Sequence, residues 1–247
     1  MERKKIMLVI LMVVIGQSVL YADYKAEIYH SFINNDMAQW KSLIDEMQQK
    51  ENKKNDFLWE LVNYQYGYIG WCLGNDKSGE AAHYLSLAEQ NLSILQQSTE
   101  NVSMIYAYKT AFYGFQIGLN IWKAPLIGSK SIESARQAVD EDPMNPYAYI
   151  QLGNIEYYRP EVFGGSKSRA LYYYLKARQL MELDQNQNSI TGDWNYLGLL
   201  TIIANTYFET GSIIMAKKYY ERILEIEPDF GWVRDELYPR VLKENNK

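Results

Sequence analysis

The hydrophobic pattern is clearest between Trp194 and Pro228, where two apolar stripes of helical period follow one another. The first stripe has the spacing of one face of an α-helix and consists of Leu200, Ile203, Ala204 and Tyr207. Gly211 interrupts the pattern, and Ser212 can cap a second helix. That helix carries Ala216, Tyr220 and Ile223, and Pro228 prevents its continuation. The segment therefore predicts two antiparallel helices in close contact at the small residues Ala204 and Ala216.

These residues also carry a family resemblance. Their spacing, Leu-x2-Ile-Ala-x2-Tyr-x3-Gly-x4-Ala-x3-Tyr-x2-Ile-x4-Pro, resembles a tetratricopeptide repeat. The resemblance fits 194–228 well, 146–183 with an inserted turn, and 57–97 and 103–142 loosely. It implies a tetratricopeptide repeat (TPR) protein of the bacterial cell envelope, in which stacked helix pairs present their first helices on a concave binding face.

The rest of the chain predicts an all-α fold, because no alternating run of Val, Ile and Thr appears in it. We expect an antiparallel helix-pair (TPR-like) solenoid of about eleven helices, forming one domain over 23–247. The expected pairs cover about 24–50, 57–97, 103–142, 146–183 and 194–228, and a C-terminal capping helix covers 230–247, kinked at Pro239. Identical Gly-Ser-Lys-Ser segments begin at Gly128 and Gly165. We expect Ser129 and Ser166 in these segments to cap second helices.

The first 22 residues have the pattern of a Sec-type signal peptide. Arg3, Lys4 and Lys5 precede an apolar run, and Ala22 offers a small residue for cleavage. The alternative is an uncleaved anchor, but the apolar run is only about half the roughly 20 residues that span a bilayer. No cysteine lies near the cleavage site, which argues against a lipoprotein. The pattern predicts a periplasmic or secreted protein without a membrane span after cleavage.

Charge narrows the choice of partner. Cleavage after Ala22 removes three of 25 basic and one of 30 acidic residues, leaving 22 against 29, a net charge of −7. This balance argues against nucleic acid or anionic membrane as the main partner. Cys72 is the single cysteine, so an internal disulfide is excluded.

Catalytic and metal-binding patterns are not found in the sequence. His30 and His83 are the only histidines, and neither has a second ligand at metal-binding spacing. The Gly-Ser-Lys-Ser segments lack the spacing of a P-loop, although an anion site at those helix starts stays open. We therefore expect a protein that is not an enzyme and that has no catalytic residues, cofactor or metal.

The turn at 159–165 carries Pro160, Phe163 and two glycines and is longer than a helical hairpin needs. Either Phe163 is tucked between neighbouring repeats, or the turn reaches over the groove or a partner. Similar Pro-x2-Phe-Gly-Gly turns occur in envelope TPR proteins, including companions of TRAP-type solute transporters.

Tyrosine is abundant, with 22 in the chain, and suits a surface that needs large contact area with a polar end. The residues that we expect to form a ligand or partner groove are Tyr147, Asn154, Tyr158, Phe163, Thr201, Asn205 and Phe208. The resulting hypothesis is a non-enzymatic exported binding or scaffold protein that recognises a protein or peptide in the cell envelope. The alternative is a solute-binding companion of a membrane transporter, similar to the TRAP type. The pattern leaves the oligomeric state open.

Overall fold

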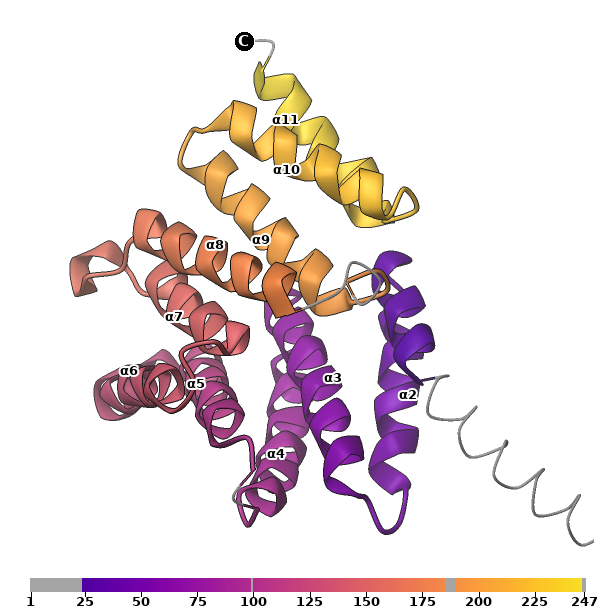
Figure 1. Ribbon diagram of the computed structural model, residues 1–247, viewed down its shortest axis with the longest axis vertical. Coiled ribbons are helices and arrows are strands. Elements are labelled where there is room, and N and C mark those ends of the chain that lie inside the picture. The colour runs from indigo at the N-terminus through magenta and orange to yellow at the C-terminus, as the bar shows by residue number, and fades with distance from the viewer. Residues whose placement is uncertain (1–23, 99, 185–189, 246–247) are drawn as a thin grey trace, which may run out of the picture.

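The computed structural model describes residues 24–98, 100–184 and 190–245, and all secondary structure in these ranges is helical (Figure 1). The all-α prediction is confirmed. The predicted signal peptide lies outside the described residues. After a helix over 24–33 come α2 (Met37–Gln49), α3 (Asn55–Gly74), α4 (Ser78–Leu95), α5 (Val102–Leu119), the 3₁₀ turn η1 (Ile121–Lys123) and α6 (Ala124–Glu141). Then follow α7 (Pro146–Tyr158), the 3₁₀ turn η2 (Glu161–Phe163), α8 (Lys167–Asp184), α9 (Trp194–Glu209), α10 (Ile213–Ile226), the π-helical stretch η3 (Val233–Leu237) and α11 (Tyr238–Asn245).

Successive helices pack as pairs, and the pairs stack into a solenoid. The pairs are α3 with α4, α5 with α6, α7 with α8, and α9 with α10. In Figure 1 they follow a curved path that brings α9 back beside α2 and α3. Among the described helices, none is both long enough and apolar enough to cross a bilayer.

Small residues set how closely the helices of a pair approach. Ala204 and Ala216 are fully buried, as the pattern predicts, and so is Ala170 on α8. A fully buried alanine leaves no side chain beyond Cβ between two backbones, so the helices can lie close together. Large residues then fill the space beside these contacts, and Tyr174 and Tyr220 are themselves fully buried.

Local signals fix most helix ends. The Asn145 side chain accepts the backbone N–H of Tyr147, and Pro146 occupies the first turn of α7, where its missing N–H costs nothing. Ser166 accepts the N–H of Arg169 at the start of α8. Gly211 has a φ of +79°, the left-handed conformation that ends α9.

The start of α6 corrects one expectation. Ser129 does not cap a helix, because α6 already begins at Ala124 and carries Pro125 in its first turn. Gly128 and Ser129 therefore lie inside the helix. The physical reason is that Pro125 is pre-set for a first helical turn, whereas a glycine inside a helix is tolerated. The two Gly-Ser-Lys-Ser segments are thus not at equivalent structural positions.

The N-terminal helix over 24–33 packs against the last helix pair and closes the stack. The Tyr29 hydroxyl donates to Oε2 of Glu227 (2.8 Å), and the ring of Phe32 lies 4.9 Å from that of Phe230. Trp194, at the start of α9, lies edge-on to Trp40 of α2 with ring centres 5.0 Å apart. Phe32 and Trp194 pack against both large hydrophobic clusters, so they join the two halves of the core.

The C-terminal cap is distorted before Pro239. The backbone N–H of Tyr238 reaches back to the carbonyl of Val233, which is the bond of a π-helix. Pro239 has no N–H to donate to residue 235, and its ring crowds that carbonyl, so the turn before it widens. The disruption that we expected at Pro239 therefore takes the form of η3.

Candidate functional site

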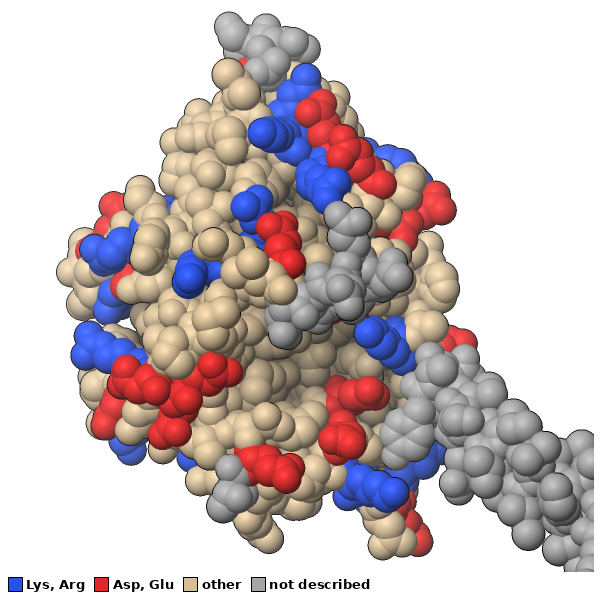
Figure 2. Space-filling model, viewed as in Figure 1, with Lys and Arg blue, Asp and Glu red and all other residues tan. Residues whose placement is uncertain are grey.

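The space-filling view shows a hollow near the middle of the drawn face (Figure 2). It lies in the region between α3, α5 and α7 of Figure 1, and the residues that line it carry no charge. We call it the central hollow. Acidic side chains lie on the surface beside it. A concave surface of uncharged residues is a candidate ligand site.

Tyr66 on α3 contacts both α5 and α7, the other two helices that border this region. Its ring stacks on Phe115 of α5, with ring centres 5.5 Å apart, and its hydroxyl oxygen accepts N–H groups from Gln151 and Asn154 of α7, both at 3.4 Å. Burial raises the pKa of the Tyr66 phenol, so the group stays protonated at neutral pH. Among the described residues its own proton has no acceptor. Tyr66 can therefore donate a hydrogen bond to a ligand.

Asn154 is held in one orientation by its neighbours. Its Nδ2 donates to Oε1 of Gln151 (3.1 Å), and its Oδ1 accepts the hydroxyl of Tyr174 on α8 (2.9 Å). Gly153 makes this contact possible, because a Cβ there would overlap the ring of Tyr174. The amide is consequently a preformed part of the wall between α7 and α8.

Tyr147 and Tyr158 lie at the two ends of the same helix. Tyr147 is half-buried, and burial, reinforced by the charge of Asp193, raises the pKa of its phenol. Tyr158 has 71% of its surface exposed, yet the surrounding protein also raises the pKa of its phenol. Tyr158 thus presents an exposed ring at the C-terminal end of α7. Both rings therefore remain candidates for ligand contact.

The structure separates the remaining predicted groove residues from these three. Thr201 is buried, and its hydroxyl donates to the carbonyl of Leu197 (2.8 Å). Asn205 accepts the hydroxyl of Tyr220 (2.6 Å), and the Arg240 guanidinium lies 4.5 Å from the ring centre of Phe208. On α9, then, the polar groups that we expected in the groove are used by contacts within the helix or with α10 and α11.

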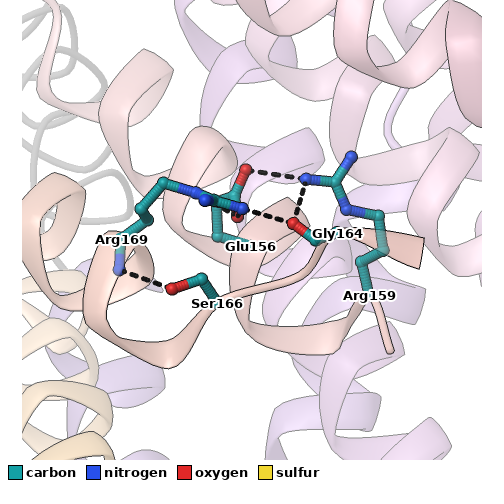
Figure 3. Close-up of polar contacts among 5 residues, drawn as sticks. All are labelled: Glu156, Arg159, Gly164, Ser166 and Arg169. Atoms are coloured by element: carbon teal, nitrogen blue, oxygen red, sulfur yellow. Dashed lines mark hydrogen bonds and ion pairs between the residues drawn. The ribbon is translucent and has the colours of Figure 1, made fainter. Parts of the chain in front are cut away.

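Phe163 lies in the inserted turn, which a polar cluster holds in place (Figure 3). Arg159 donates to Glu156 (2.8 Å) and to the carbonyl of Gly164 (3.0 Å), and Arg169 contacts the same two groups from α8. Gly164 has a φ of +88°, and a Cβ at Gly165 would overlap the carbonyl oxygen of Arg159. The turn is structured, but Phe163 is 74% exposed and is not tucked between repeats.

Sequence reasoning missed two residues that contact Asn154, namely Tyr66 and Gln151. The pattern places Tyr66 on the apolar stripe of its helix and so assigns it to the core. Gln151 and Asn154 are three residues apart on α7, a spacing that puts two amides on one helix face and could have indicated both.

Other groups with chemical potential lie elsewhere. His30 lines a hollow of about 590 Å³ beside Glu227 and Arg234, and His83 lines one of about 820 Å³ beside Trp71 and Lys77. Cys72 is fully buried, and burial raises the pKa of its thiol to about 11. Within the part of the chain that the structure describes, no group of three or more His, Cys, Asp or Glu side chains could hold a metal ion.

Comparison with solved structures gives a likeness of fold. No protein-family model matches the chain, and no curated protein sequence matches it. Among solved structures, the fold is similar to that of the HusA haemophore from Porphyromonas gingivalis, with a TM-score of 0.59 and 19% sequence identity. The match covers 77% of this chain and 94% of HusA. At this identity the likeness is one of fold.

Proposed function

We propose that this chain is an exported binding protein that holds a flat, largely apolar ligand of the tetrapyrrole class, such as haem, in the central hollow. The observation that carries the proposal is the group around Tyr66, whose ring stacks on Phe115 and whose hydroxyl oxygen accepts N–H groups from two amides and keeps its own proton for a further partner. Aromatic rings bind planar ligands by stacking, and a few placed donors fix their orientation. The proposed role is binding without catalysis.

Two further observations support this ligand class. HusA, which shares the fold, is a haemophore by name. Both histidines line hollows other than the central one, so the phenols and amides of α3 and α7 are the groups that would meet the ligand. The signal-peptide pattern at 1–22 supports export to the periplasm or outside the cell.

Recognition of a peptide in a TPR-like groove is the second candidate. The resemblance of 194–228 to a tetratricopeptide repeat favours it. Against it, Oδ1 of both Asn154 and Asn205 already accepts a tyrosine hydroxyl, and Thr201 is buried. Fewer side-chain groups then remain for a peptide backbone, so a ligand bound mainly by stacking is the better fit. This choice matches the solute-binding alternative raised by the sequence.

The test is a spectroscopic titration of the exported protein with haem and, separately, with iron-free protoporphyrin. We expect Tyr158→Ala to weaken binding at least 10-fold, because a central aromatic contact typically contributes about 2 kcal/mol. Tyr66→Phe should weaken it several-fold by removing one donor.

Tyr172→Ala is the matched control, since Tyr172 is 66% exposed on α8 and lies outside the constellation around Tyr66. It should leave both affinities unchanged. Equal losses in Tyr158→Ala and Tyr172→Ala would remove the central hollow as the site. Failure of either tetrapyrrole to bind, together with capture of extended peptides, would favour the second candidate.

A further inference from the structure

The turn between α5 and α6 exposes an unusual group of apolar side chains. Ile121 is 64% exposed, Trp122 85% and Leu126 74%. We call these three residues the apolar tip. Soluble proteins rarely leave large apolar side chains together on the surface without a partner, so the tip requires an explanation.

Hydrogen bonds of the 3₁₀ turn η1 and the first turn of α6 fix the backbone of the apolar tip. The Asn120 side chain accepts the N–H of Trp122 (3.1 Å), and the N–H of Lys123 donates to the carbonyl of Asn120 (3.0 Å). Pro125 fixes the first turn of α6 directly afterwards. Trp122 and Leu126 therefore protrude from a fixed backbone, and a partner would meet them already in place.

Charge around the tip is opposite to that of the whole protein. Between Glu100 and Glu133 the sequence contains no acidic residue, although the chain as a whole is acidic. Lys123 and Lys130 flank the tip and are exposed, and Lys130 is four residues after Leu126 on the same face of α6. Neither lysine takes part in an ion pair within the described residues.

We propose that the apolar tip docks the protein on a membrane surface that contains anionic lipid. Trp122, Ile121 and Leu126 enter the interface between headgroups and acyl chains, and Lys123 and Lys130 pair with lipid phosphates. Tryptophan favours this interface because its ring is apolar and its N–H is polar. Lysines beside an inserted apolar group can keep their charge at headgroup level while their stems remain in apolar contact.

The second exposed apolar turn shows why charge selects the first. Val162 is 87% exposed and Phe163 74%, but Glu161 precedes them and Glu156 lies in the cluster beneath. Arg159 and Arg169 both pair with Glu156, and Lys167 pairs with Glu209. Among the described residues, this turn, unlike the tip, therefore has no cation outside an ion pair to meet a lipid phosphate. It provides a control with similar apolar exposure, in which the neighbouring cations are already held in ion pairs.

Docking also has a consequence for the ligand, which rests on the proposed function. Phe115, which stacks on Tyr66 in the central hollow, belongs to α5, and the tip follows the end of that helix. The docked protein would hold this end of α5 at the bilayer, where an apolar ligand could pass between lipid and protein. The docking itself needs no ligand.

Vesicle flotation of the exported, ligand-free protein tests the proposal. The vesicles contain phosphatidylcholine either alone or with about a third of phosphatidylglycerol. We expect binding to the mixed vesicles and at least 10-fold weaker binding for Ile121→Ser/Trp122→Ser/Leu126→Ser. Lys123→Ala/Lys130→Ala should weaken binding to mixed vesicles by about 25-fold, since each juxtamembrane lysine contributes about five-fold.

The control is Val162→Ser/Phe163→Ser, which should bind the mixed vesicles as the unaltered protein does. All forms are compared with the same N-terminus, determined by mass, and with unchanged circular dichroism. Binding that the tip variants do not alter, or no binding to mixed vesicles, would overturn the proposal. So would a change of oligomeric state in the tip variants without an effect on flotation, which would assign the tip to a protein interface. Because no tetrapyrrole is present, these outcomes are independent of the proposed function.

Discussion

The α7–α8 and α9–α10 pairs have one framework in common and use it differently. In each, a tyrosine on the second helix donates to an asparagine on the first, Tyr174 to Asn154 and Tyr220 to Asn205. A small residue precedes each asparagine, Gly153 in one pair and Ala204 in the other. The tyrosine–asparagine bond is therefore a structural element of the helix pair and is not by itself a sign of a binding site.

The difference lies in what surrounds this shared bond. Asn154 also reaches Tyr66 on α3, while the turn after α7 contains η2 and its arginine cluster. Asn205 has α10 as its partner, and the turn after α9 is short and ends at Gly211. A site arises where a pair's polar groups reach a third helix, and the predictions below test that distinction.

The largest contrast should come from the two turn glycines. Gly165→Ala should cost about 3 kcal/mol of unfolding free energy, because the added Cβ overlaps the carbonyl of Arg159 and the clustered turn cannot move freely. Gly211→Ala should cost only about 1 kcal/mol, the strain of a left-handed backbone, since nothing lies within 4 Å. Urea unfolding measures both. Equal costs would mean that the α7–α8 turn is as free to adjust as the short one.

The small residues before the asparagines should also differ. Gly153→Ala should destabilise by about 2 kcal/mol, since its methyl group overlaps the Tyr174 ring. Ala204→Gly, the reverse change in the other pair, should cost about 1 kcal/mol through helix propensity. A thermal scan ranks the two variants. If Gly153→Ala were the less destabilising change, the Tyr174 ring would be able to move away from the added methyl group.

The stability of the two helix pairs should depend on alkaline pH in the same way. Burial raises the pKa of both Tyr174 and Tyr220, so the folded state keeps these protons when the unfolded chain has begun to lose them near pH 10. The stability from these groups is fully present below pH 10. Above it, stability should fall by about 1.4 kcal/mol per pH unit for each such tyrosine.

Tyr174→Phe and Tyr220→Phe should each reduce the slope of unfolding free energy against pH by up to about 1.4 kcal/mol per pH unit, the equivalent of one proton. Urea unfolding between pH 9 and 11 measures this slope. A decline that only one variant changes would show that the two hydroxyls are not equivalent.

The smallest effect on stability should separate the pairs by function. Asn154→Ala and Asn205→Ala should each cost about 1 kcal/mol by leaving a tyrosine hydroxyl without its acceptor. Only Asn154→Ala should also weaken tetrapyrrole binding, because only Asn154 supports Tyr66. Equal losses of affinity would extend the site to α9.

The fold could be predicted where local signals agree. In α7, Asn145 and Pro146 fix the N-terminal end, and the α9–α10 pair follows from its apolar period and Gly211. The predicted start of α6 at Ser129 was wrong because the repeated Gly-Ser-Lys-Ser segment was given more weight than Pro125. Identity of four residues does not establish an equivalent position in a fold.

The site could be predicted only in part, because sequence spacing does not reveal contacts between distant helices. Tyr147, Asn154 and Tyr158 were expected to face a ligand, and this stays a prediction; the structure shows that Asn154 contacts Tyr66 of α3. Tyr66 looked like a core residue because its ring has the spacing of the apolar stripe, and its contacts come from α5 and α7. Thr201 has the spacing of a groove residue, but the helix buries it.

During synthesis, the helix over 24–33 is made long before the C-terminal residues against which it packs. Tyr29 and its partner Glu227 are 198 positions apart in the chain. At about 5–20 residues per second, the helix leaves the ribosome some 10–40 seconds before its partner is made. An open repeat array could add each pair to a finished neighbour. Here the first of the described helices to be made is among the last to find its place, so a chain released early would leave Phe32 and Ile33 without the surface that covers them.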